Sequence, residues 1–192
     1  MDFNAFFSSE FDRHQAALDA TRATLMEPLA RLTEACAKAV AAGGKIVLLG
    51  NGGSAADAQH LATELTIRYI EDRAPIAAIA LTTDTSALTA GGNDLGFEEI
   101  FARQVAALCG ANDVVIGIST SGNSENVIRA LQAAKRIGAV AAGFGGGSGG
   151  RMVGLADPFL VVPTSETPRI QEMHITLGHM LCGALEKELG LI

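Results

Sequence analysis

Five short, continuous apolar runs separated by helical segments constrain the fold of this 192-residue chain more than any other feature. They are KIVLLG (45–50), PIAAIAL (75–81), DVVIGIS (113–119), AVAAGF (139–144) and PFLVVP (158–163). The runs lack polar alternation, which is typical of strands buried on both faces of a parallel sheet. Strands that alternate with helices predict an α/β fold with three layers, in which a five-stranded, mostly parallel sheet is flanked by helices.

Helical spacing of apolar residues predicts the remaining elements. An N-terminal helical pair is expected within residues 1–42, interrupted at Pro28 and ended by Gly43 and Gly44. Further helices are expected over 54–69, over 84–106 with a break near Gly91 and Gly92, over 123–137, in a short piece after Gly149, and over 166–189. The length predicts a single domain over 1–192, with residues 43–192 forming the α/β core.

Composition excludes several classes of function. A formal net charge of -7 and a pI near 5.0 argue against a nucleic-acid partner, which usually requires clustered Lys and Arg. No apolar stretch approaches the ~20 residues of a membrane span. The first residues, MDFNAFFSSEFDRHQ, contain acids and show no secretory signal, so a cytoplasmic protein without membrane contact is expected. Cys36, Cys109 and Cys182 are widely spaced and are predicted to be reduced thiols without a chemical role.

The loop after the first apolar run is rich in glycine. Gly50-Asn51-Gly52-Gly53-Ser54-Ala55 fits the pattern G-x-G-x-x-A between a strand and a helix, the context of a dinucleotide site. A ribose-binding acid should then end the next strand about twenty residues on, but that strand ends near Asp84. Glycines and a helix N-terminus suit a small phosphate equally well. A plain tight turn is the third alternative.

The loop after the third run favours phosphate. ISTSGNSEN places four hydroxyls within six residues, just before a helix: Ser119, Thr120, Ser121 and Ser124. Hydroxyls and free N–H groups at a helix start can surround one phosphate monoester without Lys or Arg. An ordinary helix cap would need only one of them. The glycine-rich stretch GFGGGSGG (143–150) is compatible with either a flexible turn or a loop that approaches a ligand.

Histidines and a carboxylate form the second group of candidates. His60 and Glu64 lie four residues apart and share a helix face, either as a functional pair or as a surface pair. On the last helix His174 and His179 point about 140° apart around the helix axis, so they are not expected to share a site. Gln171 and His179 differ by only about 80° and can face the same side, but roughly 12 Å of rise along the axis separates them. A Glu and a His suit proton transfer beside a carbonyl. His60, Glu64, Gln171 and His179 also offer ligands for a divalent metal such as zinc.

Four segments, in their order and spacing, resemble the bacterial phosphoheptose isomerases of the sugar-isomerase (SIS) domain superfamily. They are GNGGSAADAQHLATEL, TTDTSALTAGGNDLGFEEIFARQV, GISTSGNSENVIRA and TPRIQEMHITLGHMLC, and the match runs from about residue 43 to the end. The resemblance implies an SIS-type sandwich, a homotetramer, and conversion of sedoheptulose 7-phosphate into D-glycero-D-manno-heptose 7-phosphate. That reaction is the first step toward activated heptose for surface polysaccharide.

The resemblance also implies roles for individual residues. Glu64 and His179 would shuttle protons between C1 and C2 through an enediol, and Gly52 and Gly53 would make room for the sugar phosphate. The implied phosphate ligands are Ser54, Ser119, Thr120, Ser121 and Ser124. The implied sugar contacts are Asn51, Asp94 and Gln171, and the implied zinc ligands are His60, Glu64, Gln171 and His179. Active sites near subunit contacts are expected.

Two departures and two alternatives accompany the resemblance. Pro168 stands where some members have Asp, and GFGGGSGG is richer in glycine than the family's usual turn. A sister branch of the superfamily keeps the fold and the tetramer but binds the bacterial replication initiator without catalysis. That branch lacks the Glu and the late His, so Glu64 and His179 favour the isomerase. A sugar-phosphate-sensing regulator would carry a basic helix-turn-helix, and none is evident in residues 1–42.

Overall fold

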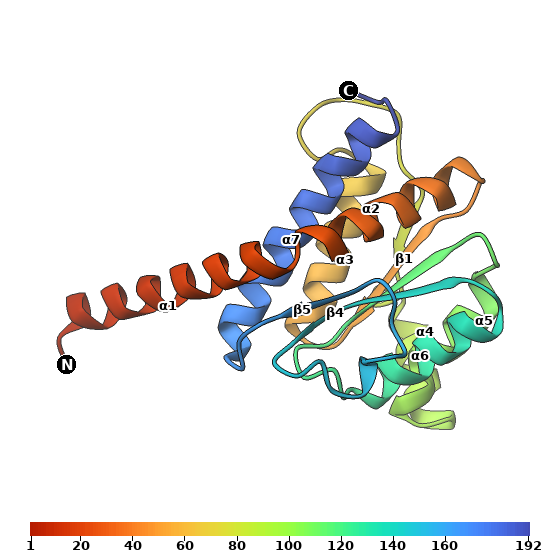
Figure 1. Cartoon of the computed structure of the whole chain (residues 1–192). Coiled ribbons are helices and arrows are strands. Elements are labelled where there is room, and N and C mark those ends of the chain that lie inside the picture. Colours follow the sequence, from red (N-terminus) through yellow and green to blue (C-terminus); the bar gives the residue numbers. More distant parts are fainter.

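A computed structural model describes all of residues 1–192 and contains one five-stranded sheet (Figure 1). The strands are β1 (Ile46–Gly50), β2 (Ala78–Ala80), β3 (Val114–Ile118), β4 (Val140–Gly146) and β5 (Phe159–Val162). Their order is β2-β1-β3-β4-β5, and every neighbouring pair is parallel. The predicted α/β class and all five strands are confirmed, and the sheet is entirely parallel.

The clearest departures from the apolar runs are in β2, which is much shorter than its run, and in β4, which extends past its run. β2 is shorter than the run 75–81 because Pro75 has no N–H and the Ile76 N–H donates to Leu65 O in the preceding helix, at 3.0 Å. β4 continues past Phe144 because its last two glycines pair with β5. The sequence pattern therefore located the strands but not their ends.

Seven α-helices surround the sheet. They are α1 (Phe3–Thr24), α2 (Met26–Ala41), α3 (Gly53–Thr66), α4 (Thr85–Asp94), α5 (Ile100–Leu108), α6 (Glu125–Arg136) and α7 (Thr167–Glu188). Two short 3₁₀ turns complete the set, η1 (Phe97–Glu99) and η2 (Gly150–Met152). The second is the short helical piece expected after Gly149.

Two predicted helix breaks were misplaced. α1 and α2 separate at Leu25, and Pro28 lies in the first turn of α2, where its missing N–H interrupts no helical hydrogen bond. The segment predicted over 84–106 breaks at Gly96, which has a positive φ of 96°, whereas Gly91 and Gly92 lie inside α4. Proline is thus tolerated in a first helical turn, and glycine is tolerated inside a helix.

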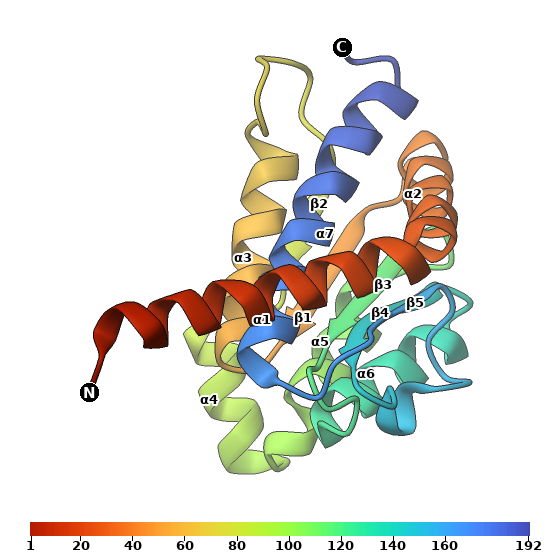
Figure 2. The ribbon, with the colours of Figure 1, turned by 60° about the vertical axis from the view of Figure 1, so that its left-hand side comes forward.

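Alternate residues of the strands face two separate hydrophobic cores. Ile46 and Leu48 of β1 pack with α2, α3 and α7, whereas Val47 and Leu49 pack with α5 and α6. All four are almost completely buried, which explains the unbroken apolar runs. Figure 2 shows α3, α7 and α2 gathered on one side of the sheet, with α5 and α6 on the other.

α3 and α7 run side by side in the same direction, and this pair carries most of the candidate site. Gly178 of α7 permits the contact, because a Cβ there would lie 2.5 Å from a methyl of Leu61. The pairing places the start of α7 beside the start of α3 and His179 beside His60. Residues far apart in sequence are thereby brought together.

The strand order also fixes where a ligand crevice lies. After β1 the chain leaves through α3 on one face, and after the neighbouring β3 it leaves through α6 on the other. In open parallel sheets ligands bind at the carboxyl ends of the strands where this reversal occurs. The expected crevice lies between the loops that follow β1 and β3.

α1 extends well beyond the body of the molecule (Figures 1 and 2). Its exposed face carries the phenylalanines Phe3, Phe6, Phe7 and Phe11. Its middle is tied to α7 by Arg169, which donates to Glu10, and by His14, which lies 2.7 Å from Glu172. None of the helices combines the length and the apolar character needed to cross a membrane.

The three cysteines are free, as predicted. Cys36 and Cys182 are buried in the core, and Cys109 is half-buried. Burial raises the pKa of the Cys182 thiol to about 12 and that of Cys109 to about 11. Burial also raises the pKa of the Cys36 thiol, so all three thiols are protonated at neutral pH.

Candidate active site

Two uncapped helix N-termini meet at the crevice between β1 and β3. Gly50 pairs with Ile118 across the two strands. A Cβ on Gly50 would lie 2.8 Å from Ser54 Cβ, so the glycine permits the close approach of strand and helix. α3 has Gly52 as its N-cap and α6 has Ser124, and neither N-cap residue bonds its helix through a side chain, while Asn126 Oδ1 accepts the Val127 N–H of α6. The free N–H groups and the positive dipole ends of both helices are suited to an anion.

Hydroxyl groups lie at this crevice and in a cavity on the β4 side of the serine loop. The hydroxyls of Ser119 and Ser124 lie 3.0 Å apart and share a hydrogen bond, and Ser54 is buried at the start of α3. Thr120 and Ser121 line a cavity of about 230 Å³ with hydroxyl residues from the loops after β4 and β5. The other lining residues are Gly146, Gly147, Ser148, Ser165, Thr167 and Ile170. The lining contains no Lys or Arg, so neutral donors dominate.

Three of these hydroxyl residues were missed from the sequence: Ser148, Ser165 and Thr167. The sequence pattern could have pointed to the loops that carry them. The carboxyl ends of parallel strands share one edge, so the rule that selected the loop after β3 applies equally to the loops after β4 and β5.

The glycine-rich stretch supports the serine loop. Gly122 has a φ of 65°, and a Cβ on it would overlap the carbonyl oxygen of Gly149. The Met152 N–H donates to Gly122 O at 3.1 Å, and the Arg151 N–H donates to Asn123 Oδ1 at 3.1 Å. Residues 143–146 belong to β4, and Gly149 and Gly150 pack backbone to backbone against the serine loop. A Cβ on Gly150 would overlap the carbonyl oxygen of Ser121, so this contact requires glycine.

Further along the α3–α7 pair, three titratable side chains converge. His60 Nε2 lies 3.2 Å from Glu64 Oε1, and His179 Nε2 lies 3.1 Å from His60 Nε2. One ligand atom from each of the three lies within 4.8 Å of the other two. Two imidazole nitrogens and a carboxylate oxygen form a donor set that zinc accepts. The same groups can also accept and donate protons.

Asp57 is a titratable neighbour that the sequence analysis missed. It lies one turn before His60 on α3 and is half-buried. Burial raises the pKa of its carboxyl group, and the charges of His60 and His179 oppose this rise. Its three-residue spacing from His60 was a readable signal, since such residues share a helix face.

The single tyrosine of the chain covers one of the histidines. The ring of Tyr69 stacks on His179, with centroids 5.5 Å apart and planes at 29°. The backbone N–H of Tyr69 donates to Glu186 Oε1 at 3.3 Å. Tyr69 lies in the loop after α3, so only the folded chain reveals this contact.

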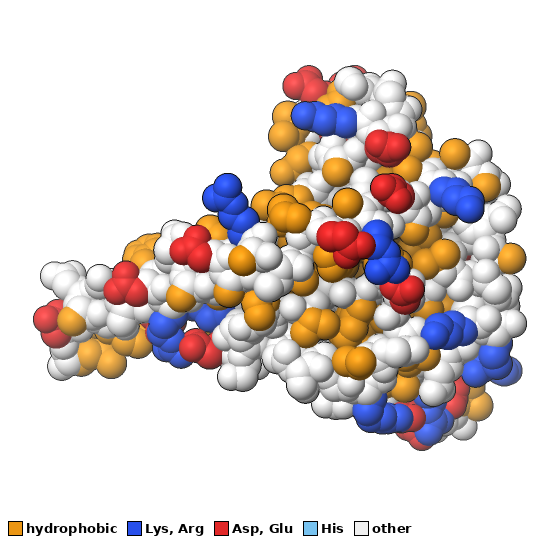
Figure 3. Space-filling model, viewed as in Figure 1, with side chains coloured by type: hydrophobic (Ala, Val, Ile, Leu, Met, Phe, Trp, Pro, Cys, Tyr) orange, Lys and Arg blue, Asp and Glu red, His pale blue; other side chains and the backbone are white.

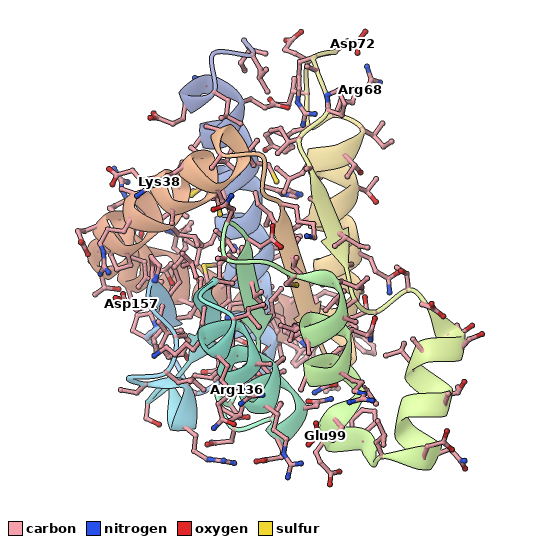
Figure 4. The ribbon with its side chains drawn as sticks, turned by 90° about the vertical axis from the view of Figure 1, so that its right-hand side faces the viewer. Lys38, Arg68, Asp72, Glu99, Arg136 and Asp157 are labelled. Carbon is pink, nitrogen blue, oxygen red and sulfur yellow. The ribbon has the colours of Figure 1, made fainter.

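A buried ion pair holds that loop. Arg73 Nε donates to Glu186 Oε1 at 2.8 Å, and both side chains are only 1% exposed. Arg73 Nη2 also donates to the carbonyl oxygen of Glu64 at 2.8 Å, which caps the end of α3. Arg68 and Asp72, from the same loop, point outward at its tip (Figure 4).

His174 faces away from this cluster, as its spacing predicted. It is fully buried beside Phe144, and its Nε2 lies 3.0 Å from Gly145 O, to which it donates. Burial lowers the pKa of His174 to about 4. This histidine is a neutral core residue beneath the end of β4.

Two predicted site residues lie apart from the cluster within one chain. Gln171 contacts the start of α3, because a Cβ on Gly53 would lie 2.6 Å from Gln171 Nε2. About 12 Å of helix rise separates it from His179. Asp94 ends α4, accepts a hydrogen bond from Asn93 at 2.7 Å, and lines a separate groove against α5 that contains no other predicted site residue. Figure 4 shows α4 standing away from α3.

Comparisons with known proteins show the family to which the chain belongs. The sequence model of the family described as "SIS domain" matches residues 11–146. The chain is 57% identical over 186 residues to a phosphoheptose isomerase of Paramagnetospirillum magneticum, covering 97% of each protein. It is 59% identical over 151 residues to one of Aquifex aeolicus, covering 79% of each.

Solved structures give the same result. The phosphoheptose isomerase GmhA from Neisseria gonorrhoeae matches with a TM-score of 0.90 and 43% identity, covering 96% of this chain and 98% of that one. A phosphoheptose isomerase from Francisella tularensis matches with a TM-score of 0.93 and 35% identity, covering 97% and 100%. Together with the family model, these matches define an SIS-domain protein. The chain belongs to the phosphoheptose isomerase family of SIS-domain proteins and is an isomerase.

Proposed function

We propose that this protein converts sedoheptulose 7-phosphate into D-glycero-D-manno-heptose 7-phosphate, the first step toward activated heptose. One observation carries the proposal: His60, Glu64 and His179 converge on the helix pair whose N-terminal end borders the hydroxyl-lined crevice. The relatives named phosphoheptose isomerase support the seven-carbon substrate. We expect the reaction to take place in the cytoplasm, with residues 1–192 acting as one unit.

The crevice would bind the phosphate through neutral donors. The hydroxyls whose hydrogens are free would donate to phosphate oxygens, and the N-termini of α3 and α6 supply N–H groups and positive dipole ends. The proposed phosphate ligands are Ser54, Ser119, Thr120, Ser121 and Ser124. Asn51 and Gln171 would contact the sugar chain, and Gly52 and Gly53 leave room for it beside the backbone.

Glu64 and His179 would move the protons. A base removes the proton from C1 of the ketose, and an acid protonates the oxygen on C2, which gives the enediol. The proton of the hydroxyl on C1 then leaves, and a proton is delivered to C2, which gives the aldose. Protons and electrons balance without an oxidant, and a carboxylate beside an imidazole suits both halves of the reaction.

The donor set fits zinc, and we propose His60, Glu64 and His179 as its ligands, with Gln171 as the fourth. The three converging atoms match the nitrogen and oxygen ligands that zinc prefers. When bound, zinc would polarise the carbonyl of the sugar. Within one chain Gln171 lies beside Gly53, about 12 Å of helix rise from His179, so a neighbouring subunit would have to supply this fourth ligand.

We also propose a homotetramer. The phenylalanines of α1 are exposed, and Figure 3 shows hydrophobic atoms along this helix where it extends beyond the body. Phe7 and Phe11 border a groove of about 470 Å³ between α1 and α7. Exposed apolar faces of this kind mark protein interfaces. A neighbouring subunit would supply Asp94, which lies far from the crevice of its own chain.

Deuterium exchange tests the proposed reaction. Purified protein is incubated with sedoheptulose 7-phosphate in deuterated water, with and without a chelator, and deuterium at C2 is followed by NMR. We expect exchange and product formation by the parent and by Glu34→Gln, which changes an exposed glutamate on α2, but not by Glu64→Gln. Absence of exchange by the parent, even with added zinc, would reject the proposal, and binding to the replication initiator without turnover would favour the alternative.

A further inference from the structure

Two asparagine side chains join the loops on either side of the crevice. Asn51 follows β1, and Asn126 lies in the first turn of α6 after β3. Asn51 Nδ2 donates to Asn126 Oδ1 at 2.9 Å, and Asn126 Nδ2 donates to Asn51 Oδ1 at 2.8 Å. Because each amide both donates and accepts, the two orientations must match, and turning over one amide alone would set like atoms against each other.

Asn126 determines the orientation of the pair. Its Oδ1 also accepts the backbone N–H of Val127 at 3.0 Å, which requires an oxygen at that position. Its Nδ2 must therefore point toward Asn51 Oδ1. Asn126 is only 2% exposed, so it has no alternative partner in solvent, whereas Asn51 is half-buried. Asn51 keeps one N–H and one oxygen lone pair for a ligand.

We infer that Asn126 is a positioning residue for the isomerase reaction. It fixes which way the carboxamide of Asn51 faces, and it sets the spacing between the sugar contact after β1 and the phosphate loop after β3. Asn126 itself is too buried to touch the substrate. The inference rests on the proposed function, in which Asn51 contacts the sugar chain.

A double-variant cycle tests the inference. We expect Asn51→Ala and Asn126→Leu each to lower kcat/KM for sedoheptulose 7-phosphate by about tenfold, the typical cost of one lost hydrogen bond. The double variant should lose no more than either single variant, because Asn126 acts through Asn51. The inhibition constant of inorganic phosphate, which reports on the phosphate loop alone, should change less than about twofold.

A substitution of the same shape separates positioning from packing. Asn126→Asp keeps the shape and the oxygens but cannot donate to Asn51 Oδ1 when ionised, so kcat/KM should fall by about tenfold here too. It also serves as the test if Asn126→Leu fails to fold. Asn112→Asp is the matched control and should keep the parent's activity. Asn112 is exposed and lies just before β3, at the end of the strands opposite the crevice.

Three results would overturn the inference while leaving the proposed function in place. These are losses that multiply in the double variant, phosphate binding that weakens in parallel with kcat/KM, or an Asn126→Asp variant with the parent's activity. A parent without turnover of sedoheptulose 7-phosphate would instead reject the proposed function, and the inference with it.

Discussion

The two ends of the α3–α7 pair are built from different chemical groups. At the N-terminal end, around Ser54 and the serine loop, the donors are hydroxyls, amides and backbone N–H groups. Further along, His60, Glu64 and His179 are titratable, and a completely buried ion pair lies behind them. A phosphate brings its own charge and needs only donors, whereas proton transfer needs groups that change protonation.

The two ends also differ in what holds them in place. Glycines hold the phosphate end by letting backbone segments touch, as Gly122 does against Gly149. The other end depends on Arg73 and Glu186, which fasten the loop that carries Tyr69. Substitutions at the two ends should therefore have separable effects on binding, catalysis and stability.

The largest expected effect is loss of catalysis in Glu64→Gln. Removing the carboxylate removes one partner of the proposed proton transfer, so kcat should fall by about a thousandfold. The inhibition constant of inorganic phosphate should stay unchanged, because the phosphate end lacks this group. Steady-state kinetics and phosphate inhibition measure the two ends separately. A parallel loss of phosphate binding would show that the two ends are not independent.

The next effect concerns stability. Glu186→Leu leaves the Arg73 guanidinium buried without its partner, and we expect the free energy of unfolding to fall by about 3–5 kcal/mol in urea titrations. Adding Arg73→Met should recover much of the loss, because the unpaired charge disappears. Glu125→Ala removes exposed ion pairs to Arg129 and Arg151 and should leave the urea midpoint unchanged. Equal effects of Glu186→Leu and Glu125→Ala would contradict this account.

Local sequence patterns predicted those parts of the molecule that local physics determines. Doubly buried strands appear as apolar runs, and the hydroxyls of ISTSGNSEN are adjacent in sequence. The pairing of His60 with Glu64 follows from helix geometry alone. In each case the residues that act together are neighbours along the chain or along one helix.

Contacts between segments far apart in the sequence could not be predicted from such local patterns. Helix spacing separates Gln171 from His179, but only the packing of α3 on α7 brings His179 to His60. Tyr69 reaches His179 through a loop whose path depends on a buried ion pair. Asn126 looks like an ordinary residue of a helix start, and its partner lies on another strand's loop. Tertiary packing, which has no local signature, determines all of these.

A smaller effect should appear when pH is lowered. The folded protein holds the pKa of His174 at about 4, below its ordinary value of 6.5. The unfolded chain therefore binds this proton first, so the stability that His174 contributes is complete above pH 6.5 and is lost as pH falls toward 4. The loss should reach about 3 kcal/mol.

His174→Gln is the matched comparison. Its side-chain amide can still donate to Gly145 O, but it does not titrate. Urea unfolding of both proteins at pH 7 and pH 4 should show a smaller decrease for the variant. If the two proteins lose the same stability between pH 7 and pH 4, the acid sensitivity arises from other groups and His174 does not contribute to it.

The smallest effect belongs to the phosphate end itself. Ser119→Ala removes one buried hydroxyl among several donors and also its hydrogen bond to Ser124. KM should rise by about tenfold, because a hydrogen bond to a charged group is lost, while kcat stays within about threefold. Ser9→Ala, on the exposed surface of α1, should change neither. A fall in kcat at constant KM would mean that the serine loop takes part in the chemical step, and the division between a binding end and a reacting end would then be wrong.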